Sequence, residues 1–226
     1  MRLACAAVLF DCDGVLLDSN PIKTEAFRAA LDGYPAAQVD QLVAFHQQHG
    51  GLSRYVKFQT FFTKILRQPV DEAKLARMLE RFGAVCRRRY LEVPLTPSCR
   101  TVLADLSSRV PLFVVSGSDQ AELQAVFRAR ELASYFQAVY GCPRPKTECV
   151  EEILKRLGSR DGVVLVGDSY LDWQTAQAHG LSFVFMARYS EAAERMRQEA
   201  QAHRFPVIDT LASLPELIAA EGIHAR

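Results

Sequence analysis

The order of hydrophobic and polar positions predicts strands that alternate with helices along most of the chain. A continuous apolar run over residues 4–10 is typical of a short buried strand. Further apolar runs predict strands at 110–115, 136–140, 163–166, 183–186 and 207–208. Between them, the period of amphipathic helices predicts helices at 21–31, 100–107, 121–130 and 147–157, one ending near Gly180, and a terminal helix. Because such strands are joined by right-handed crossovers, we predict an α/β fold whose mainly parallel sheet is covered by helices on both faces.

One long block departs from this alternation. Residues 36–90 keep a helical pattern throughout, contain no predicted strand, and are bounded by turn-forming residues at both ends. Apolar residues on the predicted helical faces indicate helices that pack on one another. We therefore predict an inserted helical domain at residues 17–91, within a core formed by residues 1–16 and 92–226.

Composition narrows the functional classes. The chain has 226 residues, of which 49% are hydrophobic and 23% charged, with a net charge of +1. This balance indicates neither a nucleic-acid surface nor a basic membrane anchor. No apolar run approaches the roughly 18 residues that span a bilayer, and the first residues do not resemble a signal peptide. Six cysteines without a C-x-x-C pair indicate reduced thiols. We expect a cytoplasmic protein, either monomer or dimer.

Candidate chemistry begins directly after the first predicted strand. Asp11 and Asp13 are two residues apart and are followed by Gly14. Open α/β sheets bind ligands at the carboxyl ends of their strands. Crowded carboxylates raise one another's pKa unless a cation neutralises them, and Mg²⁺ prefers oxygen ligands. A polar turn after a strand is the alternative interpretation of this short motif.

Further polar residues follow or adjoin other predicted elements. Ser116 comes directly after the strand at 110–115, and Asp168 follows the strand at 163–166 with Asp172 four residues later. Lys146 directly precedes the next predicted helix. Because the carboxyl ends of parallel strands lie at one edge, these residues are expected to converge with the first two aspartates.

Together these residues resemble the four motifs of the haloacid dehalogenase (HAD) superfamily. The motifs are D-x-D-G-V at 11–15, Ser116 after an apolar strand, Lys146, and G-D-x-x-x-D at 167–172. The resemblance covers nearly the whole chain, and the helical insertion resembles the cap of the phosphoglycolate phosphatase and β-phosphoglucomutase-like branch. It implies a Rossmann-like core with a helical cap. It also implies Mg²⁺-dependent hydrolysis of a small phosphomonoester, either a sugar phosphate or a phospho-acid.

The resemblance also implies a role for each motif residue. Asp11 would be the nucleophile that forms an aspartyl-phosphate, and Asp13 the general acid and then the general base. Mg²⁺ would be held by Asp11, the main-chain carbonyl of Asp13, and Asp168. Asp172 would orient water on the metal or pair with Lys146.

The phosphoryl oxygens would be bound by Ser116 and Lys146, with main-chain N–H groups of residues 12–14 and around Gly117. Three of these residues have simpler interpretations. Ser116 would otherwise cap the following helix, Asp172 would be an ordinary acid in the first helical turn, and Lys146 would be a surface lysine. The family often has Lys-Pro at this place, whereas the chain has P-R-P-K, which leaves Arg144 as a rival cation.

The predicted cap carries candidates for substrate recognition. The stretch G-G-L-S-R at 50–54 resembles the specificity loop of capped HAD enzymes, in which Arg54 would bind a distal part of the substrate. The alternative is a helix start capped by Ser53 with an exposed arginine. Lys57 lies one helical turn further and is expected to join the arginine.

Three other cap residues bear on function. The β-phosphoglucomutases have a histidine where this chain has Lys23, which lowers the case for a mutase. Lys23 would approach an anionic substrate group or lie on the helix surface. His46 and His49 are expected on a solvated helix face.

Several functions remain open on these residues. The leading interpretation is a phosphatase of small metabolites, with no nucleic-acid or membrane partner. A phosphosugar mutase is the runner-up, and a non-catalytic binding protein on the same fold is the third. Dehalogenases do not need Asp13, and a phosphonatase would need a cap lysine that forms a Schiff base.

Overall fold

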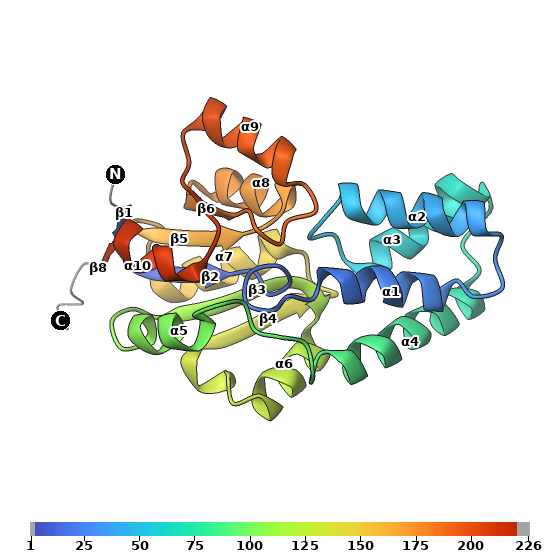
Figure 1. The fold of residues 1–226 in the computed structure, drawn as a ribbon, viewed down its shortest axis with the longest axis horizontal. Helices are drawn as coiled ribbons and strands as arrows, with labels where there is room; N and C mark the ends of the chain where they lie inside the picture. The colour runs from blue at the N-terminus through green and yellow to red at the C-terminus, as the bar shows by residue number, and fades with distance from the viewer. Residues whose placement is uncertain (1–2, 221–226) are drawn as a thin grey trace.

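The computed structural model describes residues 3–220, which are built around a six-stranded parallel sheet (Figure 1). Its strands are β2 (Ala7–Phe10), β3 (Leu112–Asp119), β4 (Ala138–Cys142), β5 (Val163–Gly167), β6 (Ser182–Met186) and β7 (Val207–Ile208). The spatial order is β4-β3-β2-β5-β6-β7, and every neighbouring pair is parallel. The first strand of the sheet along the chain, β2, therefore lies between β3 and β5. The predicted α/β class is confirmed.

Alternate residues of the central strands enter two separate cores, as expected for a sheet buried on both faces. Val8 and Phe10 belong to one core, whereas Ala7 and Leu9 belong to the other. The first core is covered by α5 (Cys99–Ser107), α6 (Gln120–Ala129) and α10 (Leu214–Leu217). The second core is covered by α7 (Lys146–Leu157), α8 (Tyr170–His179) and α9 (Ala193–His203). Burial on both faces explains why the strands read as continuous apolar runs.

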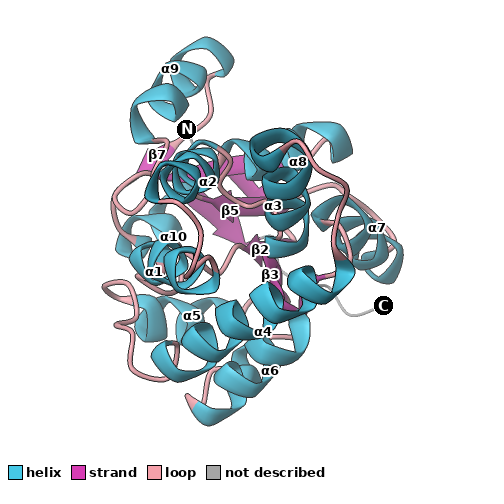
Figure 2. Cartoon of the chain, turned by 90° about the vertical axis from the view of Figure 1, so that its right-hand side faces the viewer, coloured by secondary structure: helices cyan, strands magenta, loops and turns pink. Residues whose placement is uncertain are grey.

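The remaining helices form a separate group beside the sheet. They are α1 (Asn20–Ala30), α2 (Ala36–Gln48), α3 (Arg54–Thr60), the π-helix Phe61–Leu66, and α4 (Glu72–Arg89). Figure 2 views the molecule from this side and shows these helices in front of the sheet. Phe27, Phe58 and Phe82 hold the group together, with ring centroids 4.6–6.0 Å apart.

The structure corrects two expectations at the chain ends. The predicted strand at 4–10 is divided, because Ala6 leaves the ladder and its N–H donates to the carbonyl of Gly162. The first part, β1 (Leu3–Cys5), pairs instead with β8 (Ile218–Ala220) in a two-stranded parallel sheet. Within the described residues, the only helix at the predicted terminal position is the short α10, because residues 218–220 form β8. Neither feature follows from local periodicity, because the partner of β1 lies at the far end of the chain.

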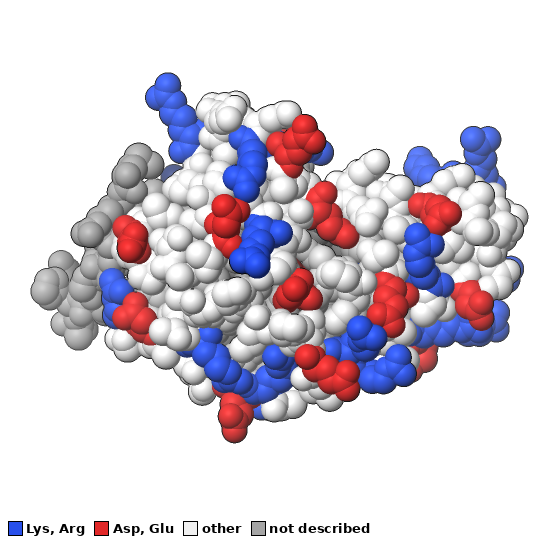
Figure 3. Space-filling view, viewed as in Figure 1, with Lys and Arg blue, Asp and Glu red and all other residues white. Residues whose placement is uncertain are grey.

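The surface agrees with the balanced composition. On the face drawn in Figure 3, basic and acidic side chains are interspersed. Within residues 3–220, none of the helices combines the length and the apolar character that a membrane crossing requires.

Candidate active site

The loop after β2 turns sharply at the carboxyl edge of the sheet. The N–H of Asp11 donates to the carbonyl of Val166 at 2.9 Å, which extends the pairing of β2 with β5. Gly14 has φ +78°, and a Cβ atom there would lie 2.2 Å from Oδ2 of Asp168. Only glycine therefore fits this turn, which brings Asp11 and Asp168 to one place.

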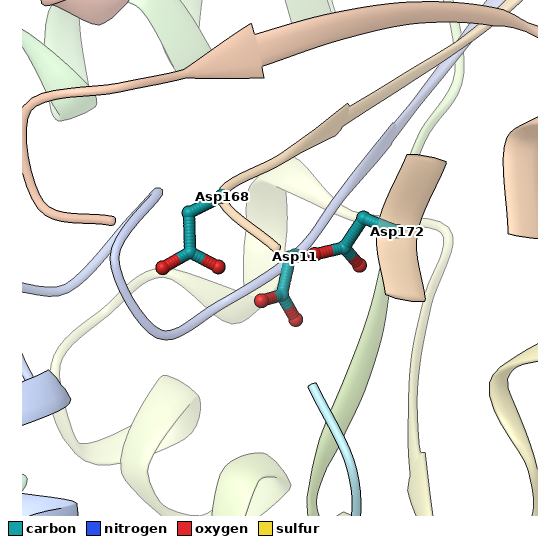
Figure 4. A group of neighbouring side chains, drawn as sticks. All are labelled: Asp11, Asp168 and Asp172. Atoms are coloured by element: carbon teal, nitrogen blue, oxygen red, sulfur yellow. The ribbon is translucent and has the colours of Figure 1, made fainter. Parts of the chain in front are cut away.

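Three carboxyl groups converge at this edge, as Figure 4 shows. Oxygen atoms of Asp11, Asp168 and Asp172 lie within 4.8 Å of one another, and all three residues are buried. Burial and the neighbouring carboxylates raise the pKa of Asp11 to about 7, although Lys146 opposes this. Burial and the charges of Asp11 and Asp172 raise the pKa of Asp168 as well. An all-oxygen donor set under mutual repulsion fits a hard divalent cation.

Asp13 has a different environment, because its side chain turns toward the helical group. Nζ of Lys23 lies 3.0 Å from Oδ2 of Asp13. Hydroxyl groups of Ser19, Tyr90 and Ser118 donate to the same carboxylate at 2.6, 2.6 and 2.7 Å. Burial opposes ionisation, but Lys23 and the three hydroxyls outweigh it and hold the pKa of Asp13 well below its usual range. The pKa values of two carboxyl groups from one motif are thereby shifted in opposite directions.

Lys146 is the buried cation of the site. Its Nζ lies 2.9 Å from Oδ1 of Asp11 and 2.5 Å from Oδ1 of Asp172. The other oxygen of Asp172 accepts the N–H of Ser169 at 3.1 Å, within a capping box at the start of α8. Asp172 is thus both a first-turn helix acid and the partner of Lys146. Arg144, the rival cation, lies at the surface in an ion pair with Glu152.

Ser116 and Gly117 lie within the carboxyl-terminal half of β3, not after the strand as predicted. Oγ of Ser116 accepts the N–H of Ser118 at 3.1 Å, and the following helix α6 is capped by Asp119. The capping alternative for Ser116 therefore does not hold. A Cβ atom on Gly117 would lie 2.1 Å from the carbonyl oxygen of Gly51. The loop before α3 thus rests directly on the strand end.

Arg54 is buried, not exposed, although Ser53 does cap its helix. Its guanidinium donates to both carboxylate oxygens of Glu122 on α6, at 2.5 and 3.1 Å. Arg87 on α4 lies 3.2 Å from the same carboxylate. Arg54 therefore joins the helical group to the core through a bidentate ion pair.

The prediction of a solvated face for His46 is wrong, whereas His49 is exposed as expected. The ring of His46 packs on Phe27 with centroids 4.7 Å apart, because this side of α2 faces α1 and α3. Nδ1 of His46 lies 2.8 Å from Nζ of Lys57, which is also buried. Sequence spacing alone did not reveal this pair, since its residues lie on different helices.

The two sides enclose a small pocket. Its core wall includes Asp11, Asp13, Gly117 and Asp168, and its opposite wall includes Lys23, His46, Arg54 and Lys57. An acidic edge that fits a divalent cation thus faces a basic wall across a space for a small anionic ligand.

Several residues of the site carried no functional prediction. The hydroxyl of Ser19 donates to Oδ1 of Asp13 at 2.6 Å. Asn20 donates to Oδ2 of Asp168 at 2.8 Å. Tyr90 reaches Asp13 from the far end of the helical block, and no local pattern marks it.

Comparisons with known proteins agree with this geometry. A curated phosphoglycolate phosphatase from Rhodobacter capsulatus is 28% identical over 223 residues, covering 94% of this chain and 96% of that protein. A haloacid dehalogenase-like family hydrolase from Streptococcus pneumoniae superposes with TM-score 0.69 at 18% identity, covering 94% and 97% of the two chains. The HAD-hydrolase YfnB from Bacillus subtilis, bound to magnesium, gives TM-score 0.66 at 17% identity, with 96% and 98% covered. The family model of haloacid dehalogenase-like hydrolases matches residues 5–180, so the chain belongs to this family, as its sequence motifs predict.

Proposed function

We propose that the protein is a Mg²⁺-dependent phosphatase that hydrolyses a small phosphomonoester through an aspartyl-phosphate on Asp11. The observation that carries this proposal is the position of Asp11, a buried carboxylate between Lys146 and Asp168 at the floor of an enclosed pocket. In this proposal residues 17–91 form the cap, and residues 1–16 and 92–226 form the catalytic core.

The proposed reaction has two steps. In the first, a carboxylate oxygen of Asp11 attacks phosphorus, the bond to the ester oxygen breaks, and Asp13 gives its proton to the departing alkoxide. In the second, water attacks the phosphorus of the aspartyl-phosphate and loses a proton to Asp13, and the Asp11 carboxylate is released. In this conformation the donors around Asp13 favour its carboxylate form, which the second step requires, whereas the first step requires Asp13 to hold a proton against these donors.

The remaining site residues would bind the phosphoryl group. Ser116 and Lys146, with main-chain N–H groups of residues 12–14 and Gly117, would donate to its oxygens as negative charge shifts. Mg²⁺ held by Asp11, Asp168 and the main-chain carbonyl of Asp13 would neutralise the repulsion between carboxylates and phosphate. One structural neighbour, the HAD-hydrolase YfnB, is bound to magnesium.

The substrate would be small because the cap closes on the core. The contact between Gly51 and Gly117 narrows the pocket, which excludes large phosphorylated molecules in this conformation. Phospho-acids and small sugar phosphates fit this limit, and the curated relative is a phosphoglycolate phosphatase.

The test is phosphate release from phosphoglycolate, sugar phosphates, nucleotides and pyrophosphate, with Mg²⁺ or with EDTA. Asp11→Asn should lower the rate by more than about a thousandfold for every substrate, because the nucleophile is lost. Asp105→Asn, an exposed change on α5, is the matched control. Release that survives Asp11→Asn would contradict the proposal. Isomer interconversion without phosphate release would indicate a mutase, and binding without either reaction a non-catalytic protein.

A further inference from the structure

Three basic side chains of the cap line the pocket, and two of them have carboxylate partners. Lys23 pairs with Asp13 at 3.0 Å, and Arg54 pairs with Glu122 at 2.5 Å. Both positive charges are therefore balanced by the protein itself.

Lys57 is the exception. It is 3% exposed, and no carboxylate of the described residues lies within ion-pair distance of its Nζ. Its close polar contact is Nδ1 of His46 at 2.8 Å, and when Lys57 is charged its ammonium group has no lone pair, so the histidine accepts. Burial and the charge of Lys23 lower the pKa of Lys57 to about 7. Glu191, which also lines the pocket, opposes this lowering through its charge, but it forms no ion pair with Lys57 among the described residues.

The contact between Lys57 and His46 also leaves the other ring nitrogen of His46 without a hydrogen-bond acceptor. When Nδ1 of neutral His46 accepts, the proton is on Nε2. Nε2 is buried and has no hydrogen-bond partner among the described residues; its distance to Oε2 of Glu191 is 3.9 Å. Burying an unpartnered donor and an unpaired ammonium is costly unless a ligand supplies what they lack.

We propose that Lys57, held by His46, binds a second anionic group of the substrate, so that the enzyme selects short phosphomonoesters carrying a carboxylate or a second phosphate. This inference rests on the proposed phosphatase function and names the substrate class. The reacting phosphate lies at Asp11 on the core wall, and Lys57 holds the other negative end on the cap wall. The small free space requires the two anionic groups to be only a few atoms apart. Arg54 is not this receptor, because Glu122 already occupies its guanidinium.

The experiment compares three probes of similar length: phosphoglycolate, the bisphosphate of ethane-1,2-diol, and 2-hydroxyethyl phosphate, which has no second charge. Lys57→Met removes the ammonium group and keeps the length and apolar stem of the side chain. We expect the ratio of kcat/KM for an anionic probe to that for 2-hydroxyethyl phosphate to fall about ten- to a hundredfold, mainly through KM. The anionic probe whose ratio falls identifies carboxylate or phosphate as the group bound.

Lys64→Met is the matched control, since Lys64 is an exposed lysine of the same helical block. It should leave the ratio unchanged. An equal loss on charged and uncharged probes after Lys57→Met would overturn the inference and indicate a structural role. An unchanged ratio would overturn it as well.

A binding measurement separates this inference from the proposed function. Calorimetry on Asp11→Asn, with and without Lys57→Met, measures whether the protein prefers the anionic probes and whether Lys57 supplies the preference. A preference that depends on Lys57, together with no phosphate release from any probe by the unchanged protein, would support the subsite and refute the phosphatase. Equal affinity for charged and uncharged probes would refute the subsite, whatever the hydrolytic activity.

Discussion

The two walls of the pocket balance their charges in different ways. On the core wall, Lys146 lies between two carboxylates, and Asp13 accepts from three hydroxyl groups beside Lys23. On the cap wall, Lys57 has only a neutral histidine. In our proposal, the carboxylates of the core wall are already balanced by protein groups, with Lys23 of the opposite wall among them, whereas Lys57 on that opposite wall is kept for the ligand. Changes to the two walls should therefore have opposite effects on stability and different effects on specificity.

The largest effect is expected from Lys146→Met, which breaks the balance of the core wall. Removing the buried cation leaves Asp11 and Asp172 without their shared partner, so the free energy of unfolding should fall by about 3 kcal/mol at pH 7. The rate of phosphate release should fall by more than about a hundredfold for all substrates. Denaturant unfolding and steady-state kinetics measure both, with the exposed Lys155→Met on the same helix as control. Activity close to that of the unchanged protein would show that Lys146 does not act at the site.

Lys57→Met should have the opposite effect on stability. A lysine whose pKa is lowered from 10.5 to about 7 in the folded protein destabilises it below pH 7. This penalty disappears as the pH rises from about 7 toward the unfolded value. Without ligand at pH 6, the variant should therefore be more stable by about 1 kcal/mol, after loss of the hydrogen bond to His46.

The measurement is denaturant unfolding at pH 6 and pH 10 in EDTA, with Lys64→Met as control. The difference between Lys57→Met and the unchanged protein should shrink at the higher pH. A variant that is less stable at pH 6 would mean that Lys57 is already compensated in the folded protein.

The smallest effect is expected from Glu122→Gln, which tests whether Arg54 and Lys57 have different roles. The amide that replaces the carboxylate would keep one acceptor for Arg54 but lose the charge that joins the cap to α6. KM should rise about threefold for charged and uncharged probes alike, because closure is weakened without any change at Lys57. The exposed Glu151→Gln is the control. A change in the ratio of kcat/KM between charged and uncharged probes would show that Arg54 also binds the second anionic group.

Much of the fold follows from local pattern. The runs that form β3, β5 and β6 are apolar on both faces and are bounded by turn residues, so their strand character and parallel arrangement were predictable. The division of residues 4–10 was not, because β1 depends on β8, more than 200 residues away. Local periodicity carries no information about such a partner.

The residues of the candidate site also divide into those that the sequence predicted and those that it did not. Asp11, Asp13 and Asp168 were predicted because each follows a buried strand, and parallel strands must present these ends at one edge. Tyr90 was not, because its hydroxyl reaches Asp13 across 77 positions of sequence. His46 was assigned to the wrong environment, because the helices that bury it are known only once the cap is folded.

By itself, then, the sequence determined the acidic edge of the pocket, since strand ends carry their residues to one place whatever else surrounds them. Only the tertiary structure decided which basic side chains of the pocket have a carboxylate partner and which do not. Arg54 and Lys57 lie one helical turn apart and are both basic, yet Glu122 on a distant core helix neutralises the first and not the second. Charge balance depends on distances in space that local spacing does not define, and it distinguishes an arginine that holds the cap from a lysine poised for a ligand.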